Sequence, residues 1–255
     1  MIASLGMYDR AETSAANDRF WALIRDNLRD AGESAPDALT RGADAYWTAW
    51  QSPELSFSQT CGFPYRARLH GQVTLIGAAD YGVEGCPAGH YASVYVTRRD
   101  DARDLMQFDG ALLAYNEGLS QSGWAAPQNH AAELGIGFRI GAASGGHAQS
   151  ARAVAEGDAE IAALDAVTWR LLQRHEPMAA ALREVGRTPP TPALPYITAA
   201  GRDGALYFAA VKAAIADLPP PDRETLCLKG IVALTRSDYL AVPTPPTPAE
   251  VALRK

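Results

Sequence analysis

The fold of this chain is decided by residues 112–124, which read Leu112-Leu113-Ala114-Tyr115-Asn116-Glu117-Gly118-Leu119-Ser120-Gln121-Ser122-Gly123-Trp124. An apolar run, a polar loop and a helix start in this order predict one strand–loop–helix unit. The first N–H groups of a helix have no partner within it and lie at its positive end, so phosphate, phosphonate, sulfonate or carboxylate groups bind there readily. Ser120 and Ser122 add hydroxyl donors, and Gly123 lets a ligand approach the backbone. Taken alone, the segment favours the simpler alternative that Ser120 or Ser122 caps the helix.

The same alternation of apolar runs and helix-period segments extends in both directions from this stretch. The predicted strands are residues 2–8, 55–60, 73–78, 91–97, 112–116, 139–143, 161–164, 194–198 and 231–234. The predicted helices include residues 14–31, 122–134, 148–156 and 207–216. The first of them places Phe20, Leu23, Ile24 and Leu28 on one face and ends before Gly32. This pattern is typical of an α/β protein with parallel or mixed sheets.

Residues 98–187 form a self-contained set of strands and helices, bounded by the strand at 91–97 and a proline cluster at 188–192. This arrangement predicts an inserted lobe. We expect lobe one at residues 1–96 and 190–255 and lobe two at residues 97–189, both Rossmann-like, with two crossing strands as a hinge. A second proline cluster at 243–248 predicts an exposed, loosely packed tail.

A second candidate group lies at the end of the apolar strand 161–164, where Asp165 precedes a helix. Ligands of open α/β sheets bind beyond the carboxyl ends of strands, so Asp165 could accept a hydrogen bond from a protonated ligand oxygen or amine. The competing interpretation is that Asp165 caps the following helix. The residues themselves leave both roles open.

Composition limits the partners. The 255 residues carry a formal net charge of −6 and no cluster of Lys and Arg, which argues against nucleic acid. No stretch approaches the roughly 18 to 20 apolar residues that span a bilayer, and no leader is visible at the N-terminus. Three cysteines exclude a complete disulfide framework, although Cys61 and Cys86 could pair. No metal-ligand spacing or nucleotide motif is present, so no metal or cofactor is expected.

With Pro127 four residues after it and Asp165 about forty residues on, Ser120-Gln121-Ser122-Gly123 resembles a motif of the phosphate/phosphite/phosphonate substrate-binding proteins of ABC transporters. The likeness covers nearly the whole chain, including the opening Ile2-Ala3-Ser4-Leu5-Gly6-Met7-Tyr8 and the turn Ser58-Gln59-Thr60-Cys61-Gly62. That family has the type 2 periplasmic binding protein fold. The resemblance implies a monomer that captures a small oxyanion between its lobes and delivers it to a transporter permease.

The resemblance also implies site residues. Ser120, Ser122 and Gly123 would contact the anionic group, Asp165 would face it, and Tyr8 would lie at the cleft wall of lobe one. Gln59 and Thr60 are further candidates for the cleft because of their position in the turn Ser58-Gln59-Thr60-Cys61-Gly62. Tyr46 and Trp47 are candidates because aromatic side chains often cover ligands, although core packing is the more ordinary role for such residues.

Two other functions stay open. The same fold hosts enzymes of thiamine-pyrimidine and menaquinone synthesis, and Cys61 with His70 is the best nucleophile and base that this chain offers. A cytoplasmic sensor that signals by closure is the second alternative. The visible residues fit a cytoplasmic protein, or a periplasmic one if a leader precedes them.

Overall fold

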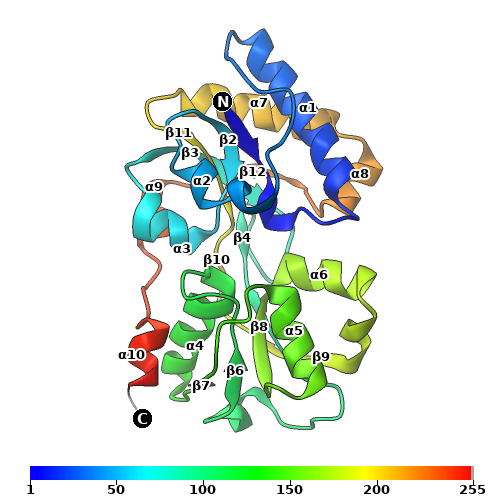
Figure 1. Ribbon diagram of the computed structural model, residues 1–255, viewed down its shortest axis with the longest axis vertical. Helices are drawn as coiled ribbons and strands as arrows, with labels where there is room; N and C mark the ends of the chain where they lie inside the picture. Colours follow the sequence, from blue (N-terminus) through cyan, green and yellow to red (C-terminus); the bar gives the residue numbers. More distant parts are fainter. Residues whose placement is uncertain (254–255) are drawn as a thin grey trace. The chain divides into compact units, whose positions relative to one another are not determined.

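A computed structural model describes residues 1–253, which divide into two compact α/β units (Figure 1). Unit 1 comprises Met1–His90 and Pro192–Ala241. Unit 2 comprises Tyr91–Thr191 together with the described residues from Val242 onward. The chain therefore passes from one unit to the other three times. The short strands β4 (His90–Tyr91) and β10 (Thr191–Pro192) stand at the first two passages and pair with each other.

Unit 1 is built on a mixed sheet in the order β1-β2-β11-β3-β12. Strands β1 and β2 are parallel, whereas β11 runs antiparallel to both β2 and β3, and β12 runs antiparallel to β3. The strands are β1 (Ile2–Ser4), β2 (Leu55–Gln59), β3 (Val73–Asp80), β11 (Pro195–Ala199) and β12 (Gly230–Val232). Every residue of β2 and β11 is buried, as expected for the central strands of a covered sheet.

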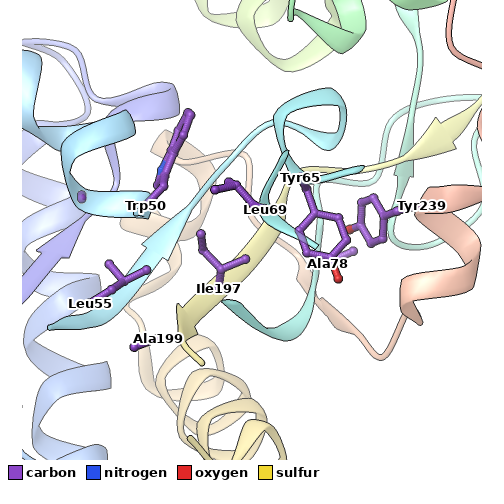
Figure 2. Close-up of a cluster of buried hydrophobic side chains, with 9 residues drawn as sticks. Trp50, Leu55, Tyr65, Leu69, Ala78, Ile197, Ala199 and Tyr239 are labelled. Atoms are coloured by element: carbon purple, nitrogen blue, oxygen red, sulfur yellow. The ribbon is translucent and has the colours of Figure 1, made fainter. Parts of the chain in front are cut away.

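Helices cover this sheet. The longest helix, α1 (Ser14–Asp30), buries Phe20, Trp21, Ile24 and Leu28 and contacts α7. A hydrophobic cluster that includes Trp50, Leu69, Ile197 and Tyr239 fills part of the core (Figure 2). The helical elements of unit 1 are η1 (Gly6–Tyr8), α1, η2 (Gly42–Ala45), α2 (Trp47–Trp50), α3 (Gly62–Pro64), η3 (Tyr65–Leu69), α7 (Gly204–Asp217), α8 (Pro220–Thr225) and α9 (Arg236–Leu240).

Unit 2 repeats the plan with the strand order β7-β6-β8-β5-β9. Strand β6 runs parallel to β7 and β8, and β5 runs antiparallel to β8 and β9. The strands are β5 (Ser93–Arg98), β6 (Leu112–Ala114), β7 (Arg139–Ile140), β8 (Ile161–Asp165) and β9 (Leu182–Arg187). The helical elements are η4 (Leu105–Phe108), η5 (Gln121–Ala125), α4 (Ala126–Leu134), α5 (His147–Glu156), α6 (Ala166–His175), η6 (Pro177–Ala181) and α10 (Pro248–Ala252). Because β6 and β8 are parallel neighbours, their carboxyl ends face the same edge of the sheet.

The C-terminal segment differs from its expected place. The sequence puts residues 190–255 in the first lobe with a loose tail, whereas contacts group the segment from Val242 onward with unit 2. The reason is specific hydrogen bonding: Trp124 and Asn129 of unit 2 donate to the backbone carbonyls of Pro246 and Pro243. Figure 1 shows α10 beside α4 and β7.

Within the described residues Cys61, Cys86 and Cys227 form no disulfide, so the pairing considered for Cys61 and Cys86 is absent. Within residues 1–253, no helix combines the length and apolar character needed to cross a membrane.

Candidate functional site

The loop between β6 and α4 contains the predicted anion-binding residues. Ser120 is the N-cap of η5, and its side chain accepts a hydrogen bond from the Gly123 N–H at 3.0 Å. The Ala125 N–H reaches back five residues to the Ser120 carbonyl at 3.0 Å, so the segment opens with a π turn rather than an α turn. Such turns recur at functional sites. Pro127, which has no N–H to donate, follows in the first turn of α4.

Two further side chains meet this turn. The Ser122 hydroxyl lies 2.9 Å from Nε2 of His147, the first residue of α5. Oδ1 of Asn116 lies where a Cβ on Gly123 would stand, and Cε1 of His147 lies 3.2 Å from the same position. Glycine at 123 is therefore required by the space that Asn116 and His147 occupy, rather than by its backbone conformation.

The corner beside Gly123 contains a neutral imidazole and two buried polar atoms without partners. Burial lowers the pKa of His147 to about 4, so its imidazole is neutral at physiological pH. Its Nδ1 and the Oδ1 of Asn116 are buried and have no hydrogen-bond partner. Buried polar atoms without partners are costly, and they are rare unless a ligand or water satisfies them.

Asp165 lies at the end of β8, the strand beside β6. Its Oδ1 accepts hydrogen bonds from the N–H groups of Val167 and Thr168 at 2.8 and 2.9 Å. The structure thus gives Asp165 the role of helix cap, one of its two predicted roles, while placing it at the same sheet edge as Ser120. Its predicted contact with a ligand stays a prediction.

In unit 1, Tyr8 and Gln59 line one small cavity of about 20 Å³, together with Asn17, Tyr81 and Tyr196. Gln59 donates from Nε2 to the Tyr81 hydroxyl at 2.7 Å, and the Tyr8 and Tyr81 rings meet edge to face. The space holds about one water molecule. Thr60 follows Gln59 at the end of β2, and its buried hydroxyl has no hydrogen-bond partner.

Tyr46 and Trp47 do not join this cavity. The Tyr46 hydroxyl donates to the Gly6 carbonyl, and its ring packs against Trp50. Trp47 packs against the Trp50 cluster beneath the Arg68 guanidinium. Trp47 is partly buried against the core cluster, whereas Tyr46 is exposed, and the contact of either residue with a ligand stays a prediction.

The sequence analysis assigned no role to Asn116, Tyr81 or His147. Asn116 falls within the quoted stretch, one turn before the Ser120 cap, but its contact with Gly123 depends on the loop conformation. The signal available for His147 was its position after Gly145 and Gly146 at a helix start. The described residues contain no group of three or more His, Cys, Asp or Glu side chains that could hold a metal ion.

Two α/β units, each built on a five-stranded mixed sheet, define the class of the fold, which is that of the type 2 periplasmic binding proteins. The match to a family model identifies the family. The model, described as ABC transporter, phosphonate, periplasmic substrate-binding protein, covers residues 49–239, and the chain belongs to this family. The predicted family, fold class and transport function are confirmed. Tyr8, Tyr46 and Trp47 lie outside the matched residues.

Solved structures agree on the fold. PhnD1 from Prochlorococcus marinus (MIT 9301), in complex with methylphosphonate, has a TM-score of 0.70 and 16% identity over 99% of this chain and 97% of that chain. XAC2383 from Xanthomonas citri, bound to ATP, has a TM-score of 0.65 and 16% identity over 99% of this chain and 96% of that chain. A binding protein component of an ABC phosphonate transporter (PA3383) from Pseudomonas aeruginosa has a TM-score of 0.64 and 15% identity over 93% of this chain and 83% of that chain. No curated protein matches the sequence. The family is periplasmic and serves transport, which implies a small ligand and a permease partner.

Proposed function

We propose that this protein captures a small tetrahedral oxyanion of the phosphonate, phosphate or phosphite class and passes it unchanged to an ABC transporter permease. The supporting observation is the pair of buried atoms, Asn116 Oδ1 and His147 Nδ1, that lack partners beside Gly123. A protonated ligand oxygen at this position would donate to Asn116 Oδ1 and accept from His147 Nδ1, and it would also meet the N-terminal end of the helix formed by η5 and α4.

The chemistry of each group fits such a ligand. A neutral imidazole has one N–H, so when the Ser122 hydroxyl donates to Nε2, Nδ1 carries the proton and can donate to an oxyanion. The Asn116 amide presents an acceptor for a protonated ligand oxygen, or a donor after a 180° rotation of its side chain. Together these groups would recognise an anion that carries one proton.

Asp165 completes the proposed site in unit 2 from the neighbouring strand end, and Tyr8, Gln59 and Thr60 stay as predicted contacts of unit 1. The enzyme alternative finds less support. Cys61 is buried at the start of α3. A reactive thiolate needs a cationic and accessible environment instead.

Isothermal titration calorimetry tests the proposal with inorganic phosphate, phosphite, methylphosphonate, a sulfonate and a carboxylate. We expect the phosphorus oxyanions to bind and Ser122→Ala to weaken them at least tenfold. Ser237→Ala, which changes an exposed serine of unit 1, is the matched control and should bind as the unmodified protein does. Absence of binding by every anion, or equal affinity of Ser122→Ala and the control, would contradict the assignment.

A further inference from the structure

The residues that follow the third passage, Val242–Ala252, are here named the C-terminal strap. The strap contacts both sides of the candidate anion site. Pro246 accepts a hydrogen bond at 3.1 Å from the indole N–H of Trp124, which lies in η5 two residues after Ser122. Pro248 packs against Gly118 in the loop before η5, where a Cβ would come within 3.0 Å of its ring.

The strap has a defined conformation where it makes these contacts. Prolines at 243, 245, 246 and 248 fix the backbone φ angle at each of these positions. A capping box closes the turn, since the Thr247 N–H donates to Glu250 and the Glu250 N–H donates to the Thr247 hydroxyl. Asn129 of α4 adds a hydrogen bond at 2.9 Å to the Pro243 carbonyl.

Close packing does not hold the strap along its whole length. A cavity of about 340 Å³ lies between it and the α4–β7 region, lined by residues that include Ile136, Phe138, Pro245 and Val251. The contacts at Gly118, Trp124 and Asn129 attach the strap to unit 2, together with the packing of α10 against β7. Two of these three contacts fall on the loop and helix start that hold Ser120, Ser122 and Gly123.

Trp124 links the strap to the site from inside the unit. Its side chain is fully buried, and its ring lies 4.9 Å from that of Tyr115, the residue that follows β6. Trp124 belongs to the same π turn as Ser122, whose hydroxyl lies within hydrogen-bonding distance of His147. Small displacements matter because a hydrogen bond weakens steeply as its distance lengthens or its angle departs from linear.

We propose that the C-terminal strap positions the anion site, and that Trp124 is the positioning residue through which Pro246 sets the place of Ser122. This inference rests on the proposed function for its binding consequence. Its structural consequence is independent of any ligand, because Ser122 contacts His147 in the ligand-free protein as well.

The test compares Trp124→Phe, which removes only the indole N–H and part of the ring, with Trp169→Phe. Trp169 is the matched control because it is also buried in unit 2 and donates its indole N–H, to Glu184 at 2.8 Å, without touching the strap. Methylphosphonate affinity is measured by calorimetry, and His147 titration is followed by NMR in the ligand-free protein. We expect Trp124→Phe to bind about three- to tenfold more weakly and its His147 pKa to rise toward the ordinary value, while Trp169→Phe changes neither.

A second variant covers the other contact. Gly118→Ala displaces Pro248 and should produce the same two changes with the indole intact. If Trp124→Phe and Gly118→Ala both bind and titrate as the unmodified protein does, the strap has no positioning role. If the unmodified protein binds no anion, the proposed function fails, and the His147 titration alone then decides the inference about the strap.

Discussion

A methyl group added at Gly123 tests the candidate site most directly. A Cβ at this position would overlap Oδ1 of Asn116, would stand 2.9 Å from its Cγ and would stand 3.2 Å from Cε1 of His147. Gly123 has no positive φ angle, so alanine suits the backbone and by itself should stabilise the helix by about 0.5 to 1 kcal/mol. Overpacking of this kind costs about 1 to 3 kcal/mol. The expected net effect of Gly123→Ala on the free energy of unfolding therefore lies between no change and a loss of about 2.5 kcal/mol.

The effect on binding should be larger than the effect on stability. The two displaced side chains carry the two unsatisfied atoms of the site, so we expect methylphosphonate or phosphate affinity to fall at least tenfold, equivalent to about 1.4 kcal/mol. Calorimetry measures the affinity, and urea unfolding followed by circular dichroism measures the stability. Gly137→Ala is the control, because no heavy atom lies within 4 Å of its Cβ position and its φ is also not positive. It should leave affinity unchanged.

A double-mutant cycle identifies the cause. Asn116→Gly removes the side chain that occupies the Cβ position, so in that background Gly123→Ala should lose most of its cost to stability. Additive effects of the two substitutions would show that the contact is not the source. The placement of the anion beside Gly123 is refuted if folded Gly123→Ala binds within twofold of the unmodified protein.

Two more outcomes follow from buried polar groups. Tyr81→Phe leaves the buried Nε2 of Gln59 without its acceptor and should cost about 1 to 3 kcal/mol of unfolding free energy, whereas Tyr46→Phe removes a hydrogen bond from an exposed tyrosine and should cost less than about 1 kcal/mol. His147 binds a proton more readily in the unfolded chain, where its pKa is about 6.5, than in the folded protein, where it is about 4. The free energy of unfolding should therefore fall by roughly 1 to 3 kcal/mol as pH drops from about 6.5 to about 4, and His147→Gln should flatten this part of the stability profile.

The sequence predicted the elements that carry their own periodicity. Helix α1 matches its predicted range to within one residue at its C-terminal end. The prediction succeeded because its signals are local: an apolar face at Phe20, Ile24 and Leu28, and a stop at Gly32. Strand β9 was missed, since Leu182–Arg187 is rich in charged residues and becomes a strand only by pairing with β5 at the edge of the sheet. The six residues of β9 contain no local signal for a pairing with a strand so distant in the sequence.

In the candidate site, too, local features could be predicted from the sequence and contacts between distant residues could not. A helix start with hydroxyls is visible in Ser120 and Ser122, and the structure places both there. The contact of Ser122 with His147 joins residues 25 positions apart, and the contact of Trp124 with Pro246 joins residues 122 positions apart. Such contacts depend on how the elements pack, so a single sequence without that packing contains no local signal for them. The second proline cluster predicted an exposed, loosely packed tail, whereas hydrogen bonds to the Pro243 and Pro246 carbonyls tie this segment to unit 2.

The geometry of Ser122 and His147 also helps to distinguish a site that binds an anion from a site that catalyses a reaction. A serine 2.9 Å from an imidazole nitrogen has the arrangement of a nucleophile and its general base. In hydrolases of that type the second ring nitrogen donates to a carboxylate, which orients the imidazole and stabilises its protonated form. Here that nitrogen, Nδ1, is buried without a partner, and burial holds the His147 pKa at about 4, below the range in which a general base works near neutral pH. A neutral imidazole with one unused nitrogen is poorly suited to accept the serine proton, but it is suited to donate a hydrogen bond to an anion that binds and leaves unchanged.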